Sequence, residues 1–350
     1  MTLRLYIPKD AAAVSVGADQ VAEAVAAEAA RLGVALDVVR NGSRGLYWLE
    51  PLVEVEVAGQ RFAYGPVMPA EVPGLFAADW LHGGAHPLYR GPTEDIPYLK
   101  NQARLTFARM GRSDPLSLED YIEHGGLKGL ERALAMRPEA IVAAVDSAGL
   151  RGRGGAGFPT GIKWRTVMNA EADRKFIVCN ADEGDSGTFS DRMLMEGDPY
   201  CLIEGMIIAG LAVGADTGYI YLRSEYPAAW EMLENALIHA YREGLLGENL
   251  LGSGRCFELH LFKGAGAYVC GEETSLLESI EGKRGLVRAK PPLPALQGLF
   301  GRPTVVNNVI TLASVPWILA HGGEAYRDYG MGRSRGTLPF QLAGNLKYPG

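Results

Sequence analysis

The chain has 350 residues, of which 47% are hydrophobic, and its 34 basic and 41 acidic side chains give a formal net charge of −7. This length is enough for two or three buried cores, and the acidic balance argues against nucleic acid as a main partner. The first ten residues lack a basic segment followed by an apolar core, so we expect no secretory signal. The longest apolar run, residues 200–215, contains Glu204 and is too short to cross a bilayer, so we predict a buried helix there and no membrane insertion.

The four cysteines, Cys179, Cys201, Cys256 and Cys270, form no CxxC pair and no disulfide pattern. We predict that they are small buried apolar groups in a protein of the reducing cytoplasm. We do not expect them to bind an iron–sulfur cluster.

The first part of the chain has the pattern of a small α/β domain. Short alternating apolar runs predict strands, and an alanine-rich amphipathic stretch that ends at Gly33 predicts a helix. In chain order we predict a strand at 3–7, a helix at 18–32, a strand at 34–39, and a hairpin of 52–57 with 61–64. We assign this domain to residues 1–80 and a linker rich in glycine and proline to residues 81–112. His82 and His86 in that linker lack a third ligand, so we predict no metal site.

The second part of the chain alternates helices with short apolar strands. Two short helices are predicted first, at 114–124 and 127–136, with Ser117 as a candidate cap. Predicted strands at 175–179, 217–222 and 256–262 then alternate with predicted helices at 199–214 and 227–243. Such alternation predicts βαβ units and a parallel sheet.

A glycine-rich loop at residues 151–163 follows a predicted helix at 138–149. A backbone with few Cβ atoms can approach a flat or anionic ligand closely, and the loop also carries basic side chains. It lacks the Gly-Lys-Ser/Thr of a P-loop. Its first glycines have the spacing of a dinucleotide fingerprint, but a helix rather than a strand precedes them, so the context of a Rossmann turn fails. A purely structural turn remains the alternative.

Polar side chains follow the predicted strand at 175–179, namely Asn180, Asp182, Glu183 and Asp185. In open α/β sheets this end of a strand is where ligands bind. The carboxylates and the amide are able to accept hydrogen bonds from sugar or polyol hydroxyls, or to hold a divalent cation. An acidic turn that caps the next helix is an equally good interpretation.

Three further segments carry polar residues in suggestive places. Glu272 and Glu273 follow a second glycine-rich turn at a predicted helix start, where carboxylates suit the positive helix end. Lys290 is presented by a stiff, proline-rich segment. Asn307 or Asn308 is predicted to cap the helix that follows them.

Together, five motifs in this order resemble the flavin-binding subunit of NADH dehydrogenases. The family includes the flavoprotein subunit of complex I, the diaphorase subunit of NAD-reducing hydrogenases and the β subunit of soluble NAD-dependent formate dehydrogenases. The resemblance covers about residues 110–350 and rests on these motifs: GLRGRGGAGFPTG at 149–161, CNADEG at 179–184, GAGAYVCGEET at 264–274, KPP at 290–292 and NNV at 307–309.

The resemblance implies which residues line each cofactor. Those implied for FMN are Gly152, Arg153, Gly154, Lys163, Asn180, Asp182, Glu183, Tyr268, Gly271, Glu272, Asn307, Asn308 and Thr311. Those implied for the nicotinamide dinucleotide are Gly155, Ala156, Phe158, Asp185, Glu273 and Lys290. Glu183 and Tyr268 are the side chains that we assign to the catalytic centre. Hydride transfer between nicotinamide and flavin requires stacking of the two rings, and no side chain has to act as acid or base.

The chain departs from the family pattern at a few positions. Complex I members tend to have a glutamate in place of Asp185 and aromatic residues in place of Thr166 and Leu293. The C-terminal cysteine motif for a 4Fe-4S cluster does not occur in this sequence. Residues 331–350 resemble the start of the ubiquitin-like domain that precedes the cluster domain, so we expect the sequence to be truncated before it.

We therefore predict an α/β fold with a thioredoxin-like domain without cluster cysteines, a Rossmann-like FMN-binding domain with a parallel sheet at 113–330, and the start of a ubiquitin-like (SLBB) domain. Complex I flavoprotein subunits usually lack such an N-terminal domain, whereas formate dehydrogenase β subunits and some hydrogenase diaphorases carry one, and we take this to favour the formate dehydrogenase β subunit. This implies two partners, a thioredoxin-like 2Fe-2S γ subunit and a larger iron–sulfur and molybdenum α subunit. A non-catalytic nucleotide-binding assembly subunit is the alternative from another class, and it predicts a flavin-free protein.

Overall fold

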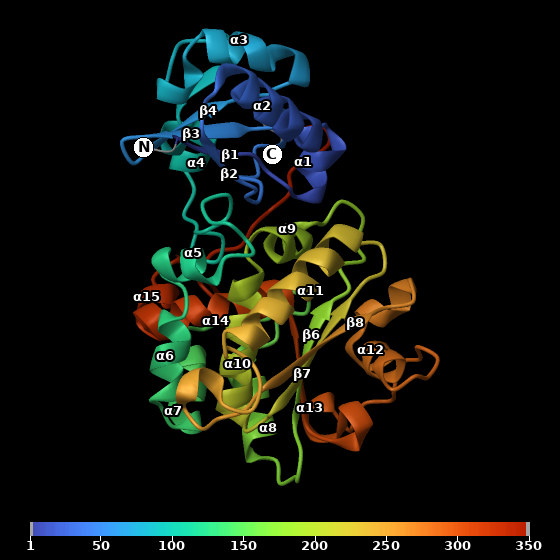
Figure 1. Cartoon of the computed structure of the whole chain (residues 1–350). Helices are drawn as coiled ribbons and strands as arrows, with labels where there is room; N and C mark the ends of the chain where they lie inside the picture. Colours follow the sequence, from blue (N-terminus) through green and yellow to red (C-terminus); the bar gives the residue numbers. More distant parts are fainter. Residues whose placement is uncertain (1–2, 348–350) are drawn as a thin grey trace. The chain divides into compact units, whose positions relative to one another are not determined.

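The computed structural model describes residues 3–347, which divide into two compact units (Figure 1). The first unit contains the described residues up to 104, together with 109–115 and 342–347, and the second contains 105–108 and 116–341. Each unit has its own sheet and its own core, and each is described by itself below.

The first unit is a five-stranded sheet with the order β2-β1-β3-β4-β5. β1 and β2 are parallel, and every other pair is antiparallel. The predicted order of strand, helix, strand and hairpin is confirmed, while the assignment of a thioredoxin-like fold to this unit stays a prediction. The elements are β1 (Leu3–Tyr6), α1 (Ala11–Ser15), α2 (Ala18–Leu32), β2 (Leu36–Val39), β3 (Val53–Val57), β4 (Gln60–Tyr64), α3 (Val72–Ala77), β5 (Tyr89–Pro92) and α4 (Pro97–Lys100).

Local sequence signals explain the elements that were predicted well. α2 ends at Gly33, whose φ of 69° lies in the left-handed region that glycine adopts most readily. The hairpin turn at Ala58 and Gly59 has φ values of 50° and 78°, the paired positive values that match the twist of two antiparallel strands. Each signal lies within a few residues of the element that it ends.

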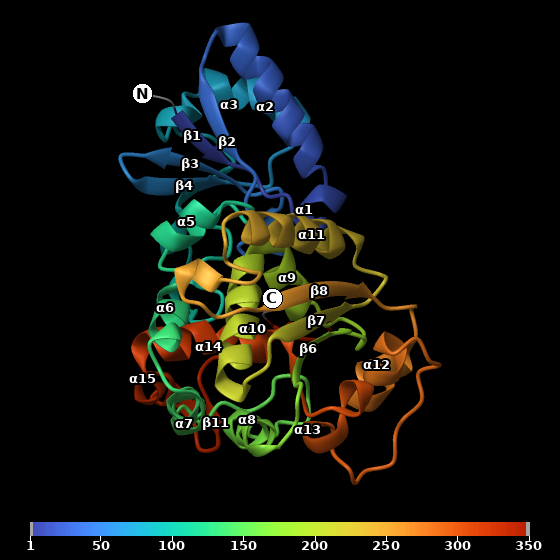
Figure 2. The same ribbon diagram turned by 60° about the horizontal axis from the view of Figure 1, so that its bottom comes forward.

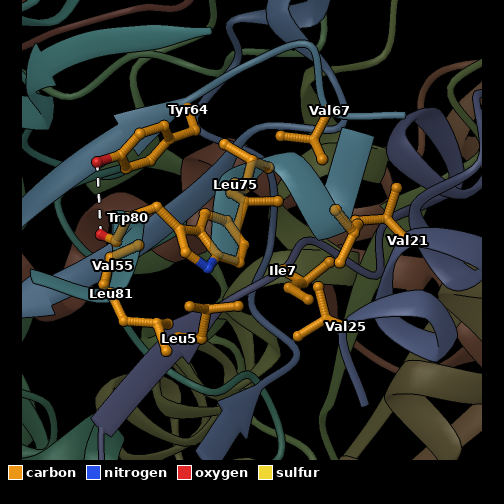
Figure 3. Packing of buried hydrophobic residues seen from close by; sticks show 12 residues of the cluster. Leu5, Ile7, Val21, Val25, Val55, Tyr64, Val67, Leu75, Trp80 and Leu81 are labelled. Carbon is orange, nitrogen blue, oxygen red and sulfur yellow. Dashed lines mark hydrogen bonds between the residues drawn. The ribbon is translucent and has the colours of Figure 1, made fainter. Parts of the chain in front are cut away.

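Trp80 lies at the centre of the core of the first unit (Figure 3). Leu5 and Ile7 from β1 and its end, and Val21 and Val25 from α2, belong to the same buried cluster. The Tyr64 hydroxyl donates to the Trp80 carbonyl oxygen at 3.4 Å and to the Gly84 carbonyl oxygen at 2.8 Å. This packing holds α2 against the sheet.

Residues 81–112 differ from the linker that the sequence predicted. β5 lies within this segment and pairs with β4, so part of it extends the sheet of the first unit. Its glycine and proline content marks turns around a short edge strand, because proline is tolerated at a sheet edge.

The second unit is built on a four-stranded, all-parallel sheet with the order β8-β7-β6-β9. Its strands are β6 (Phe176–Ala181), β7 (Thr217–Leu222), β8 (Glu258–Lys263) and β9 (Thr304–Asn308). From β6 the chain builds outward to β7 and β8, and it then returns to place β9 on the opposite side of β6. The strand order therefore reverses between β6 and β9, which is where open parallel sheets leave a crevice at their carboxyl ends.

Helices cover both faces of this sheet (Figure 2). On one face, α12 packs its leucines against Phe176 and Val178, and α10 and α14 pack against β6 from the other face. The helices are α5 (Leu118–Glu123), α6 (Lys128–Leu134), α7 (Pro138–Ser147), α8 (Thr160–Asn169), α9 (Ser190–Gly197), α10 (Pro199–Val213), α11 (Pro227–Arg242), α12 (Glu273–Ile280), α13 (Pro294–Gln297), α14 (Val309–His321) and α15 (Gly323–Arg327).

α10 is the buried apolar helix predicted at residues 200–215. Its one acidic residue, Glu204, is buried and accepts hydrogen bonds from the Tyr121 hydroxyl at 2.5 Å and from the backbone N–H groups of Leu127 and Leu130 at 2.9 Å. The carboxylate therefore caps the start of α6, which explains a charge in an otherwise apolar helix. Among residues 3–347, no helix is long and apolar enough to cross a membrane.

The prediction that all four cysteines are buried needs one correction. Cys179, Cys201 and Cys270 are buried as predicted, but Cys256 is exposed, because it lies in the turn before β8.

The segment expected to begin a ubiquitin-like domain contains little regular structure. Beyond residue 329 the structure has a short hairpin of β10 (Gly330–Met331) and β11 (Ser334–Arg335), and residues 336–347 form no strand. Residues 348–350, at the end of the expected ubiquitin-like segment, lie outside the described part of the chain.

Glu50 lies in a buried polar turn of the first unit. One carboxyl oxygen accepts from the Ser43 hydroxyl at 2.6 Å and the other from the Leu52 N–H at 2.8 Å. Burial, together with the neighbouring Asp10 and Glu54 carboxylates, raises the pKa of Glu50 to about 8. Glu50 is therefore neutral in the folded protein at pH values where an exposed glutamate is charged.

We predict that Glu50 makes the chain less stable as the pH rises. Because its folded pKa is raised, its contribution is complete below the unfolded pKa of about 4.5 and is lost as the pH rises through about 8. Glu50→Gln should therefore unfold at a higher temperature relative to the wild type at pH 9 than at pH 5. Thermal unfolding of both proteins across this range tests the point, with the exposed Glu23→Gln as control; parallel profiles for wild type and Glu50→Gln would contradict it.

Candidate functional site

The glycine-rich loop connects α7 to α8 and is pinned at its base. Residues Arg151 and Pro159 form an antiparallel bridge, and the Gly152 N–H donates to the Phe158 carbonyl oxygen at 2.9 Å. At the tip, Gly155 has a φ of 101°, a conformation that side chains rarely adopt. The predicted helix before the loop is present as α7, so the loop is not a Rossmann turn.

Thr311 and Arg153 fix the loop to the rest of the second unit. The Arg153 N–H donates to the Thr311 hydroxyl oxygen at 2.8 Å, and Thr311 lies in the first turn of α14. The Arg153 guanidinium donates to the Tyr326 hydroxyl at 3.2 Å and to the Arg335 carbonyl oxygen in β11. The guanidinium is thus engaged by α15 and the short hairpin, although Arg153 also lines the site.

The ends of β6 and β9 bring three asparagines together. Parallel pairing sets Asn180 opposite Asn308 and Cys179 opposite Asn307. The Asn180 side chain donates to the Gly271 carbonyl oxygen at 2.8 Å, and Asn307 accepts from the indole N–H of the buried Trp164 at 2.8 Å. These bonds hold the strand ends against the second glycine-rich turn and α8.

Two cavities open at this edge of the sheet, of about 670 Å³ and about 460 Å³. Both are lined by the same five residues, which we call the shared wall: Gly154, Asn180, Gly271, Glu272 and Asn308. A Cβ atom at Gly154 would lie 3.2 Å from the Asn308 Cβ, so this glycine allows the loop to approach β9 closely. The shared wall places two ligand-sized spaces side by side.

Glu183 is turned into the protein rather than into open solvent. Its carboxylate accepts from the backbone N–H groups of Asp191 and Arg192 at 3.0 and 3.1 Å, and from the Tyr226 hydroxyl at 3.1 Å. Its carbonyl oxygen accepts from Arg223. Because it accepts from these two N–H groups, Glu183 caps the first turn of α9 at the edge of the larger cavity, and only 7% of the residue is exposed.

The other acids of this turn are more accessible. Burial raises the pKa of Asp182 to about 6, in spite of the opposing effect of Arg223. Tyr268 is 71% exposed, and its hydroxyl donates to Asp185 at 2.7 Å. The ring packs over Gly184, where a Cβ atom would come within 2.9 Å of it. Tyr268 and Asp185 thus form an exposed rim of the larger cavity.

A chain of alternating charges borders the smaller cavity. The Lys290 ammonium donates to Glu272 at 2.8 Å and to Glu273 at 3.0 Å, and Lys163 lies 3.5 Å from Glu273. Burial alone would raise the pKa of Glu272, but hydrogen bonds from Lys290, Thr274 and the Ser275 N–H lower it to about 2. Glu272 therefore stays ionised across the working pH range while it caps α12.

The structure gathers the residues that the sequence singled out. Every one lines at least one of the two cavities, except Thr311, which is buried beneath the glycine loop. The cavities do not divide along the assignment to flavin and dinucleotide, because Gly155 and Asp185 line the larger one, while Gly152, Lys163 and Asn307 line the smaller. The assignment of individual residues to each ligand stays a prediction.

Several lining residues were not predicted. Thr166 and Leu293, noted only as departures from the family pattern, both line the smaller cavity. Asp191 lines the larger cavity from α9 and is almost completely buried. Nothing in its sequence neighbourhood marks it, because only the fold brings α9 to the strand ends. The other unpredicted members are Gly157, Gly184, Thr188, Ser190, Val269, Pro294, Ala295, Thr304 and Val306.

Comparisons with known proteins place this site in a known context. Residues 145–317 match the model of the Nuo51 FMN-binding domain family. The chain is 49% identical over 253 residues to an NADH-quinone oxidoreductase subunit of Aquifex aeolicus (strain VF5), covering 72% of this chain and 59% of that protein. It is 49% identical over 251 residues to an NADP-reducing hydrogenase subunit of Solidesulfovibrio fructosivorans, covering 72% of this chain and 51% of that protein.

A solved structure matches over a longer range. A chain of an NAD⁺-reducing NiFe-hydrogenase in the air-oxidised state superimposes with a TM-score of 0.60 and 31% sequence identity. That match covers 99% of this chain and 58% of the hydrogenase chain. The present chain thus spans between about half and three fifths of the length of these proteins.

We predict that Glu183 stabilises the fold through its cap. Glu183→Ala leaves two N–H groups of α9 without their acceptor and should lower the free energy of unfolding by about 1–3 kcal/mol. Glu183→Gln keeps one acceptor oxygen and should lose less. Denaturant unfolding measures the difference, with Tyr268→Phe as a control expected to change stability by less than about 0.5 kcal/mol. An Ala variant as stable as the wild type would show that the cap contributes nothing.

Proposed function

We propose that the chain belongs to the family of flavoprotein subunits that includes the complex I flavoprotein subunit and the hydrogenase diaphorases, and that it is an FMN-dependent subunit that exchanges electrons between NADH or NAD⁺ and iron–sulfur clusters. The observation that carries this proposal is the pair of cavities with a shared wall at the carboxyl ends of β6 and β9. Two cofactors that exchange a hydride must lie in contact, and adjoining cavities allow this.

The residues of the larger cavity fit FMN. Gly154 and Gly271 carry no side chain, so the shared wall leaves space for a ligand at these two positions. Asp182 and Asn180 supply acceptors and a donor for the hydroxyls of a ribityl chain. Lys163 lines the adjoining cavity, with its ammonium bonded to the Val306 carbonyl oxygen at 2.8 Å, and it supplies a positive charge for anionic oxygens of the ligand.

The smaller cavity suits the adenosine half of a dinucleotide. Phe158 is half exposed and offers an aromatic face for an adenine ring, while Leu293 and Val306 make the lining apolar. Glu273 is placed to accept from ribose hydroxyls, and Lys290 balances its charge. We keep the sequence-based assignment of Ala156 to this ligand, because it lines the same cavity.

The residues of this chain act by binding and orientation. FMN held in this site would supply hydride acceptance from NADH and one-electron release. Asn180, Gly271 and Asn308 hold the shared wall through bonds to neighbouring elements, so the wall needs little rearrangement on binding. Tyr268 and Asp185, joined by their hydrogen bond, form the rim of the larger cavity. No side chain has to donate or accept the transferred hydrogen.

More specifically, we propose that the chain is the β subunit of an NAD-dependent formate dehydrogenase. The thioredoxin-like first unit, which has no cysteine, supports this assignment. Its partners would be a thioredoxin-like 2Fe-2S subunit and a larger iron–sulfur and molybdenum subunit, in the cytoplasm, where the unpaired cysteines stay reduced. The diaphorase subunit of an NAD-reducing hydrogenase is the second candidate, favoured by the match over 99% of the chain.

We predict that the chain binds FMN and that NADH reduces it. The purified chain, loaded with FMN under anaerobic conditions, should lose its visible flavin absorbance when NADH is added. Lys163→Ala should weaken FMN binding, because it removes a positive charge from the lining of the adjoining cavity. A folded chain that binds no flavin would reject the proposal, and one that binds flavin without being bleached would contradict the assignment of the smaller cavity.

We also predict the electron donor of the complete enzyme. The complex that co-purifies with the tagged chain from its native cells should reduce NAD⁺ with formate and not with hydrogen. NAD⁺ reduction followed by absorbance under each donor gives the answer. Reduction with hydrogen alone would replace the formate dehydrogenase assignment by the hydrogenase one.

A further inference from the structure

Asp191 is a buried acid in the wall of the larger cavity that no step of the proposed function uses. It is the second residue of α9, and only 4% of it is exposed. One of its carboxyl oxygens accepts from the Asn308 side-chain amide at 2.6 Å. A buried carboxyl group costs free energy unless it makes such bonds, so its position calls for a physical reason.

Asp191 stands in the middle of a continuous series of hydrogen bonds around the cavity. Its N–H donates to Glu183, at the end of β6, at 3.0 Å. Its carboxyl group receives the Asn308 amide, and the Asn308 oxygen accepts from the N–H of Thr311 at 3.3 Å. The Thr311 hydroxyl in turn accepts from the N–H of Arg153 in the glycine loop at 2.8 Å. The series joins the β6 turn, α9, α14 and the glycine loop.

The direction of the Asn308 amide matters most in this series. Its oxygen caps α14 through the N–H groups of Ile310 and Thr311, so its nitrogen must find an acceptor elsewhere. Asp191 is that acceptor, supplied by another helix. Without it the Asn308 amide would be held through its oxygen alone, and Asn308 lines both cavities as part of the shared wall.

The surroundings of Asp191 favour its neutral form. Burial, and then the charge of the nearby Glu183, raise the pKa of Asp191 well above its ordinary value. Asp191 also affects the buried Cys179 thiol on β6: burial, and then the charge of Asp191, raise the pKa of this thiol. On its own helix the charged neighbours are Arg192 and Glu196. A neutral carboxyl group is the form that an asparagine side chain imitates most closely.

We propose that Asp191 is a positioning residue for the flavin: by receiving the Asn308 amide, it holds the shared wall in the arrangement that binds FMN. This inference rests on the proposed function, because FMN is the ligand by which it is tested. It assigns no contact between Asp191 and the transferred hydrogen. It requires only that the acceptor at position 191 be present.

The test uses the full chain and the quenching of FMN fluorescence on binding, which gives the dissociation constant without any turnover. Asp191→Ala and Asp191→Leu should weaken FMN binding by about tenfold to a hundredfold, because each removes the acceptor that fixes the nitrogen of the Asn308 amide. Asp191→Asn keeps an acceptor oxygen and should bind within about threefold of the wild type. Glu234→Ala, on the exposed side of α11, is the matched control and should bind like the wild type.

Circular dichroism and thermal unfolding without FMN check that each variant folds. The inference is overturned if the Ala and Leu variants bind FMN as tightly as the wild type, or if the Asn variant is as weak as they are. The inference would also be overturned if Asp191→Ala and Asp191→Leu failed to fold while Asp191→Asn folded. The acceptor at position 191 would then be required for folding rather than for binding FMN. A wild-type chain that binds no FMN would instead reject the proposed function, and this inference with it.

Discussion

The parallel pairing of β6 with β9 is the constraint on which the rest of the site depends. It sets Asn180 opposite Asn308 and leaves a crevice where the strand order of the parallel sheet reverses. The glycine loop, the β6 turn and the second glycine-rich turn all meet at this crevice, although they lie far apart in the sequence. A shift of β9 by one residue would exchange the faces to which Asn307 and Asn308 point and would break the pairing of Asn308 with Asn180.

Helix caps supply much of the rigidity around that crevice. Glu183 caps α9, Glu272 caps α12 and Asn308 caps α14, and each of these residues also lines a cavity. The capping interpretation and the binding interpretation of the polar segments are therefore compatible. A side chain that satisfies a helix end is already fixed in direction, which lowers the cost of ordering it when a ligand binds.

The elements of the fold that could be predicted from the sequence are those marked by residues within or next to them. α2 and α10 follow from apolar patterning and from the glycines that end them, and the strands of both sheets other than β5 and β9 follow from short apolar runs. The gathering of Asn180, Gly271 and Asn308 followed from a resemblance between motifs, because no local pattern reports that distant turns meet. β5 escaped prediction because its neighbours in the sheet, rather than its own composition, make it a strand.

Contacts made only in the folded chain account for the rest. Asp191 lies in a short helix without any distinguishing motif, and the fold alone brings it to Asn308. Arg153 was predicted from its charge, yet its guanidinium binds Tyr326 and the hairpin that follows α15. Both cases show that residue type predicts which chemistry is available, while tertiary contacts determine where it is used.

The central claim is that the two cavities with a shared wall hold flavin and dinucleotide in contact. An experimental structure of the chain with FMN and NAD⁺ bound tests this most directly. The account predicts the flavin in the larger cavity and the dinucleotide in the smaller, with their rings meeting at the shared wall beside Gly154 and Asn308. The claim would be contradicted if either ligand bound away from the shared wall, or if the two ligands bound without contact between their rings.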